Sequence, residues 1–192
     1  MAKLKVDTIS GIGTEGPVFE GDIQFTSQNF LTLPKGDTTQ RGRGRAVFFS
    51  GNDNTTPAAD AIKNNIDFIT IATTGNSSDF GDMTRTGSNA SAACSATRMV
   101  IGSSTGPGVI DFLTIATQGN TVTFGDMKVD RSSFAAMSDC IRGVFAGGDG
   151  SPAQYSEIDY FNIATTGDAV DFGDLPFQNQ QTTGCSNGHG GL

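Results

Sequence analysis

Ile66 to Met83 reads IDFITIATTGNSSDFGDM, and this stretch recurs twice further along the chain. The second copy, Ile110 to Met127, reads IDFLTIATQGNTVTFGDM, and the third, Ile158 to Leu175, reads IDYFNIATTGDAVDFGDL. Nine of the 18 columns are identical in all three copies, no gap is needed, and the copies start 44 and then 48 residues apart. Chance does not produce such a match, so the chain is built from repeats.

Each copy is predicted to contain two strands joined by a turn. Residues 66–71 carry apolar side chains on both faces, as in a strand that neighbouring sheets cover on both sides. The threonine, glycine and asparagine of residues 73–76 favour a turn, and residues 78–82 are predicted to return as a short strand.

Two further strand candidates precede each copy. One begins with arginine and ends in glycine: Arg45–Gly51, Arg98–Gly102 and Arg142–Gly148. The other consists of small residues and occurs before the second and third copies only: Ala90–Cys94 and Phe134–Met137. About four short strands in a unit of this length resemble a kelch-type blade of a β-propeller. We therefore expect an all-β fold with three kelch-like repeats, near residues 44–83, 90–127 and 134–175 of a repeat domain that spans 44–192.

The last residues are expected to begin a fourth unit, because Cys185–Leu192 resembles the opening of Cys94–Ile101. Residues 184–192 are predicted to close the fold by supplying the small-residue strand that the first unit lacks. Three units are fewer than the four to eight blades of an ordinary ring, so an obligate homo-oligomer is expected. A trimer is favoured, and a dimer that closes a six-bladed ring is the alternative.

Residues 1–43 do not share the repeat and are predicted to form an N-terminal β arm. Its strand candidates are short, separated by glycines, and too poor in large side chains to bury a core in one chain. We expect the arm to wind together with other copies and to attach the protein. The residues predicted to serve attachment and oligomerisation are the larger apolar ones: Val6, Ile9, Val18, Phe19, Ile23, Phe25, Phe30, Leu31 and Leu33.

Charge and hydropathy narrow the range of partners. A net charge of −8 and a pI near 4.4 argue against nucleic-acid binding, which needs a basic face. No run of 18 apolar residues is present, so no membrane insertion is expected. The opening residues Met1–Lys5 lead into polar sequence, so no signal peptide is predicted. No two of the three cysteines have Cys-x-x-Cys spacing, and we interpret all three as reduced thiols.

No catalytic constellation is visible, so we expect no enzyme activity, no cofactor and no metal. The one histidine, His189, lies near the end of the sequence among glycines. Two aspartate columns recur in every copy: Asp67, Asp111 and Asp159, and Asp82, Asp126 and Asp174. A catalytic pair needs to occur only once, so these acids are predicted to make structural hydrogen bonds. Calcium binding and an acid pair for glycoside cleavage are the alternatives.

The opening KVDTISGIGTEGPVFEGDIQFTSQNFLTLP, residues 5–34, resembles the virion-attachment ends of tail-fibre-like proteins from marine phages, especially those of cyanobacteria. The repeats, with CIRGVFAGG at 140–148, look like kelch-like repeats of the same group. The resemblance implies a phage virion structural protein, a fibre-like or surface appendage made in the host cytoplasm and located in the virion. Its implied partners are itself, other virion proteins and, as a further candidate, a host-surface glycan. The alternatives are a carbohydrate-binding or carbohydrate-cleaving host-recognition module and a capsid decoration protein.

Overall fold

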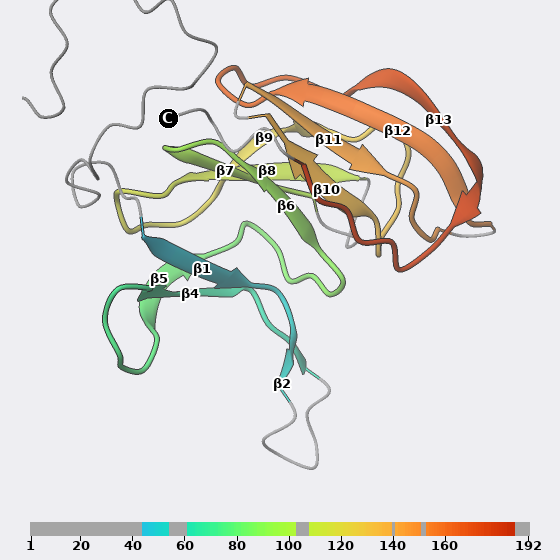
Figure 1. The fold of residues 1–192 in the computed structure, drawn as a ribbon. Helices are drawn as coiled ribbons and strands as arrows, with labels where there is room; N and C mark the ends of the chain where they lie inside the picture. Colours follow the sequence, from blue (N-terminus) through green and yellow to red (C-terminus); the bar gives the residue numbers. More distant parts are fainter. Residues whose placement is uncertain (1–43, 54–60, 103–107, 140, 151–152, 187–192) are drawn as a thin grey trace, which may run out of the picture. The chain divides into compact units, whose positions relative to one another are not determined.

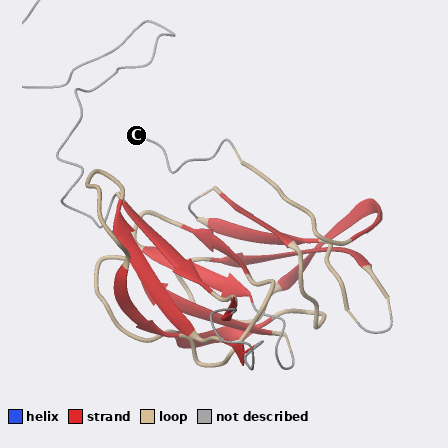
Figure 2. Cartoon of the chain, turned by 90° about the horizontal axis from the view of Figure 1, so that it is seen from below, coloured by secondary structure: helices blue, strands red, loops and turns tan. Residues whose placement is uncertain are grey.

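A computed structural model describes residues 44–53, 61–102, 108–139, 141–150 and 153–186 of the chain. All of them belong to a compact unit of residues 37–192. Every regular element within these ranges is a β-strand, and no helix occurs in them (Figure 2). The prediction of an all-β fold is confirmed. The strands form three antiparallel sheets and one short ribbon (Figure 1).

Each repeat folds into one sheet in which neighbours in sequence are neighbours in space. The first sheet has three strands: β1 (Arg45–Phe49), β4 (Asn65–Thr70) and β5 (Ser78–Asp82). The second has four: β6 (Ser91–Cys94), β7 (Arg98–Gly102), β8 (Val109–Thr114) and β9 (Val122–Asp126). The third has four: β10 (Ala135–Ser138), β11 (Arg142–Ala146), β12 (Tyr155–Asn162) and β13 (Val170–Asn179). The ribbon consists of β2 (Asn52–Asp53) and β3 (Ala61–Ile62).

The predicted small-residue strands are β6 and β10, and among the described residues the first sheet has no counterpart of them. Strand β1 is therefore an edge strand, whereas β7 and β11 are each paired on both sides. The joining of the sheets into a propeller remains a prediction.

A β-bulge recurs at the same place in all three sheets. In the first sheet Ile66 lies opposite Gly81 and Asp67 lies opposite Asp79, so Phe80 is the extra residue on its strand. The same shift makes Phe124 and Phe172 the extra residues in the other sheets. A bulge redirects side chains and increases the local twist. Phe80 and Phe124 are 2% and 3% exposed.

The hydrophobic core consists of two clusters, and each lies between two consecutive sheets. One cluster joins Ile66 and Phe80 of the first repeat to Ile101 and Leu113 of the second. The other joins the second and third repeats, and it contains Ala93, Val100, Ile110, Phe124, Met127, Phe134, Phe145, Phe161 and Ile163. A sheet in this protein therefore obtains its buried face from a neighbouring repeat. The second sheet has such a neighbour on each side, which explains why both faces of residues 110–115 are mostly apolar.

Candidate functional site

The contact between consecutive repeats is built around a turn that lies against a strand edge. The backbone amide of Gly119, in the turn after β8, donates to the carbonyl of Phe80 in β5 at 2.8 Å. The amide of Thr121 donates to the carbonyl of Asp82 at 2.9 Å. Between them, the Asn120 side chain accepts a hydrogen bond from the Asp82 amide at 3.0 Å. These bonds satisfy backbone groups on the outer edge of β5.

The second and third repeats make the same contact with equivalent atoms. The amide of Gly167 donates to Phe124 at 2.9 Å, and the amide of Ala169 donates to Asp126 at 2.8 Å. Here the residue between them is Asp168, whose carboxylate accepts from the Asp126 amide at 3.0 Å. Since both contacts use the same backbone groups, the interface is a property of the repeat itself.

The arginines that begin β1 and β7 each fasten the turn of the next repeat. Arg45 Nη1 donates to the carbonyls of Ile115 and Ala116 at 2.8 and 3.1 Å. Its guanidinium also lies over the ring of Phe68, 4.8 Å from the ring centroid. Stacking on its own sheet holds the side chain in place for these two acceptors.

Arg98 performs the same role one repeat later. Its Nη1 donates to Ile163 and Ala164, both at 2.9 Å, and its guanidinium lies 4.3 Å from the centroid of the Phe112 ring. Arginine therefore recurs at this position because Arg45 and Arg98 each make a contact between sheets.

The glycine of the Phe-Gly-Asp segment is required by the closeness of this contact. A Cβ built on Gly81 would lie 2.5 Å from the backbone of Gly119, and one on Gly125 would lie 2.2 Å from the carbonyl oxygen of Gly167. Any side chain at these two positions would push the turn away from the strand.

The first recurring aspartate has a different hydrogen-bond partner in each repeat. The carboxylate of Asp67 accepts a hydrogen bond from the side-chain amide of Asn65 at 3.1 Å. The buried carboxylate of Asp111 accepts from the hydroxyls of Thr84 and Thr121, so it ties the inter-repeat segment to the turn. Asn65, Thr84 and Thr121 do not belong to the nine identical columns of the repeat. The repeat pattern alone therefore did not identify them as partners.

Asp159 and Arg131 form an ion pair that is shielded from solvent. Arg131 Nη2 lies 3.0 Å from Asp159 Oδ2 and also donates to the carbonyl of Phe145 at 3.2 Å; both side chains are fully buried. Burial raises the pKa of Asp159 and lowers that of Arg131, while their mutual attraction opposes both changes. Among the described residues, Arg131 Nε and Nη1 and Asp159 Oδ1 have no hydrogen-bond partner. The pair therefore fixes the segment between the second and third repeats at a considerable desolvation cost.

The second recurring aspartate contributes to the interface through its backbone. Asp82 and Asp126 use their amides and carbonyls, as described above, while their side chains are exposed. At these two positions the strand amide donates to a side chain of the turn, so the turn supplies the acceptor. Asp174, the third member, accepts a hydrogen bond from the Ser156 hydroxyl at 3.4 Å.

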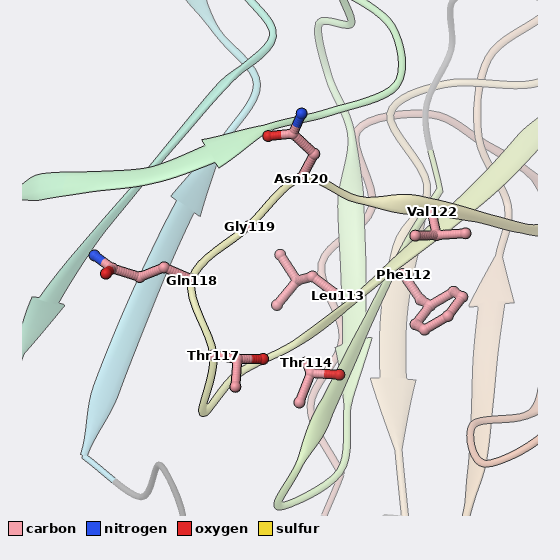
Figure 3. A pocket seen from close by; sticks show the side chains of 8 residues that line it. All are labelled: Phe112, Leu113, Thr114, Thr117, Gln118, Gly119, Asn120 and Val122. Carbon is pink, nitrogen blue, oxygen red and sulfur yellow. The ribbon is translucent and has the colours of Figure 1, made fainter.

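A surface hollow of about 160 Å³ lies beside the turn of the second repeat (Figure 3). Phe112 and Val122 form part of its wall. Its amide side chains already hold the repeats together: Gln118 donates to the carbonyl of Asp79 at 3.0 Å, and Asn120 accepts from β5. The hollow is therefore part of the interface between repeats.

The remaining candidate groups are partly outside the described residues. His189, Cys140 and the nine attachment residues of the arm lie there. Cys94 and Cys185 are exposed. Within the described ranges, no group of three or more His, Cys, Asp or Glu could hold a metal ion, and no helix could cross a membrane.

Sequence reasoning missed two features of this interface. Arg131 lies in the segment after the second copy of the repeat, and the equivalent residue after the first copy is Gly87. The repeat pattern did not identify Arg131 because the arginine does not recur. The acceptor side chain of the turn was missed because its column contains Asn76, Asn120 and Asp168 rather than one identical residue. The chemistry they share, a short side chain with an acceptor oxygen, was the available signal.

Comparison with protein-family models and with curated proteins finds no match to this chain.

Proposed function

We propose that the protein is a structural component of a phage virion, a fibre-like or surface appendage that displays its repeats and attaches through residues 1–43. The observation that carries a structural role is the recurring contact between repeats. Its turns, arginines and glycines, and the buried acids beside it, all serve the packing of one sheet on the next. The placement in a virion rests on the resemblance of residues 5–34 and of the repeats to marine-phage appendages.

The structure around the recurring acids supports a scaffold more than a glycan-cleaving module. A retaining or inverting glycosidase needs two carboxylates facing one substrate across about 5–10 Å of accessible space. Asp111 and Asp159 are instead buried, at 6% and 0% exposure, and bonded within the fold. A separate host-glycan contact through loops remains compatible with the proposed scaffold role.

The test of the virion role is the location of the protein in purified particles. Antibody labelling should place it on the particle surface, and a variant that begins at Gly44 should fail to incorporate although its strand content is retained. Normal incorporation without residues 1–43 would overturn the attachment role. Release of oligosaccharides from host surface glycans, abolished by one Asp→Asn change, would establish the cleaving alternative instead.

A further inference from the structure

The outer face of the third repeat presents one half of the inter-repeat contact. Its β13 carries Phe172, Gly173 and Asp174 where the first repeat carries Phe80, Gly81 and Asp82. Phe172 is 55% exposed, whereas the equivalent phenylalanines of the other repeats are 2% and 3% exposed. No described atom lies within 4 Å of a Cβ built on Gly173, although the same position in the other two repeats meets a turn.

The fastening arginine is also in place on this face. Arg142 lies over the ring of Tyr160, 4.6 Å from its centroid, as Arg45 and Arg98 lie over their own rings. Those two arginines donate to the carbonyls of the following turn, whereas no described carbonyl accepts a hydrogen bond from the Arg142 guanidinium. The third repeat thus holds the donor ready for a turn that its own described chain does not supply.

The first repeat presents the other half. Its turn, residues 71–77, begins with Ile71, which is 65% exposed, whereas the equivalent Ile163 is 1% exposed in the core between the second and third repeats. The turn also contains Asn76 at the position of Asn120, whose side chain accepts the strand amide in the first contact. Residues 1–43, which precede this repeat, contain neither a copy of the repeat nor a Phe-Gly-Asp sequence.

The segment after the third repeat occupies the place where the small-residue strand of a further unit would begin. Gln181 has φ 55°, and Asn89 and Ser133, at the same distance after the first and second repeats, both have φ 54°. In those repeats the small-residue strand follows at once, as β6 or β10. Residues 182–186 lie beside β10: the hydroxyl of Ser186 donates to the carbonyl of Ser138.

The strand that could pair with this segment is β1 of the first repeat, whose outer edge has no strand partner among the described residues. Phe48 of β1 is 53% exposed, whereas the equivalent Ile101 of β7 is 1% exposed. In the second sheet Ala92 lies opposite Ile101. The same register would place Gly184 opposite Phe48 and would complete a fourth strand in the first sheet.

We propose that a second copy of this chain docks head to tail, with the turn of its first repeat on β13 and its β1 beside residues 182–186. The amides of Gly75 and Ser77 then donate to Phe172 and Asp174, and Arg142 donates to Ile71 and Ala72. Phe172, Ile71 and Phe48 become buried together. A second copy is the occupant because one chain carries both halves of a contact it already makes twice. The interface is heterologous, and the inference stands independently of the virion role.

The test links two cysteines placed at the proposed contact. In a background where Cys94, Cys140 and Cys185 are serine, the pair Asn76→Cys and Asp174→Cys should join separate chains through a short bismaleimide linker. The matched control pair is Asp168→Cys and Asp126→Cys, which occupies the same positions in the contact between the second and third repeats. The control should link within one chain, so the mass of the polypeptide increases by one linker and no linked pair of chains forms. A linked control without linkage between chains of the test pair would overturn the proposal.

Single-cysteine variants test the direction of docking. A chain with Asn76→Cys should link to a chain with Asp174→Cys, and neither should link to a copy of itself. Linkage of either variant to itself would show an isologous contact and overturn the head-to-tail arrangement.

A charged substitution tests whether the apolar part of the contact is needed. Added to the cysteine pair, Ile71→Asp should reduce linkage between chains at least tenfold. Ile141→Asp is the matched control, because Ile141 is 69% exposed and its equivalent, Thr97, stays exposed in the contact between the second and third repeats. Linkage that is unchanged by Ile71→Asp, or lost equally with Ile141→Asp, would contradict the proposed interface. Association through residues 1–43 alone produces neither the specific link nor its dependence on Ile71.

Discussion

Arg131 and Asp159 are the most deeply buried charged residues in the described part of the chain, at 1% and 0% exposure. Each is tolerated there because the other neutralises it, and removal of one partner leaves a buried charge without compensation. We expect Arg131→Met to lower the free energy of unfolding by about 3–5 kcal/mol in urea denaturation at pH 7. The double variant Arg131→Met with Asp159→Leu should recover much of this loss; a double variant no more stable than the single one would contradict this account.

The pH dependence of that single variant follows from the pKa of Asp159. Burial raises this pKa, and Arg131 is the main charge that opposes the increase, so Arg131→Met should raise it further. A carboxyl group with a raised folded-state pKa contributes stability at low pH, which is lost as the pH rises through that pKa. The stability difference between the wild type and Arg131→Met should therefore narrow from pH 7 to pH 5.5. In a variant that also carries Asp159→Asn, the difference from the wild type should change less with pH; an equally wide gap at both pH values in the single variant would refute the assignment.

Gly81 permits the contact between repeats because its side chain is a single hydrogen atom. It has φ 149°, and a Cβ there would lie 2.5 Å from the Gly119 backbone, so Gly81→Ala adds both backbone strain and a clash. We expect a loss of roughly 1–3 kcal/mol in unfolding free energy. Gly75→Ala is the control, since nothing lies within 4 Å of its Cβ position, and its effect should stay within about 0.5 kcal/mol. Equal effects of the two changes would show that the close approach is not what requires glycine.

The strands of each repeat were predictable because their pattern recurs. Residues 66–71 and 78–82 and their copies became β4 and β5, β8 and β9, and β12 and β13, and the arginine-led segments became β1, β7 and β11. The bulge was not predictable from alternation, because Phe80 and its equivalents read as ordinary strand residues until the register is known. The contact of the Asp82 column was also not predictable, because sequence cannot show whether a backbone amide or a carboxylate faces the next turn.

The segment after β13 is held by contacts with the third sheet rather than by a strand partner. Thr182 donates to the carbonyl of Ala146 at 3.2 Å, and a Cβ on Gly184 would lie 2.5 Å from the sulfur of Met137. Deletion of residues 182–192 should expose Met137 and cost about 2 kcal/mol, which corresponds to a Tm lower by roughly 4–8 °C. Thermal unfolding followed by circular dichroism measures this change. An unchanged Tm would show that the segment contributes nothing to the third sheet.

The three sheets are held to one another by the apolar clusters that lie between them. Each core cluster is shared by two repeats, so the two outermost faces of the described array are left with exposed apolar groups and free strand edges. Such faces tend to associate, and a head-to-tail contact either closes into a ring or continues into a filament. Every contact of this kind rotates one repeat by the same angle relative to the previous one. A ring forms if these rotations close on the first repeat, and a filament forms if they do not.

The number of copies follows if the array closes with blade-like geometry. Rings of this type contain four to eight units, so two chains with three repeats each fall within the range, whereas three chains would bring nine. We therefore expect a native mass of twice 19.9 kDa for the 192-residue chain, measured by light scattering at micromolar concentration. The trimer favoured by the sequence rests on residues 1–43, so a trimeric mass would mean that this arm determines the number of copies. In that case a variant that begins at Gly44 should lose the trimer while Asn76→Cys and Asp174→Cys still link. A stable monomer would contradict both the ring and the arm, because each requires more than one chain.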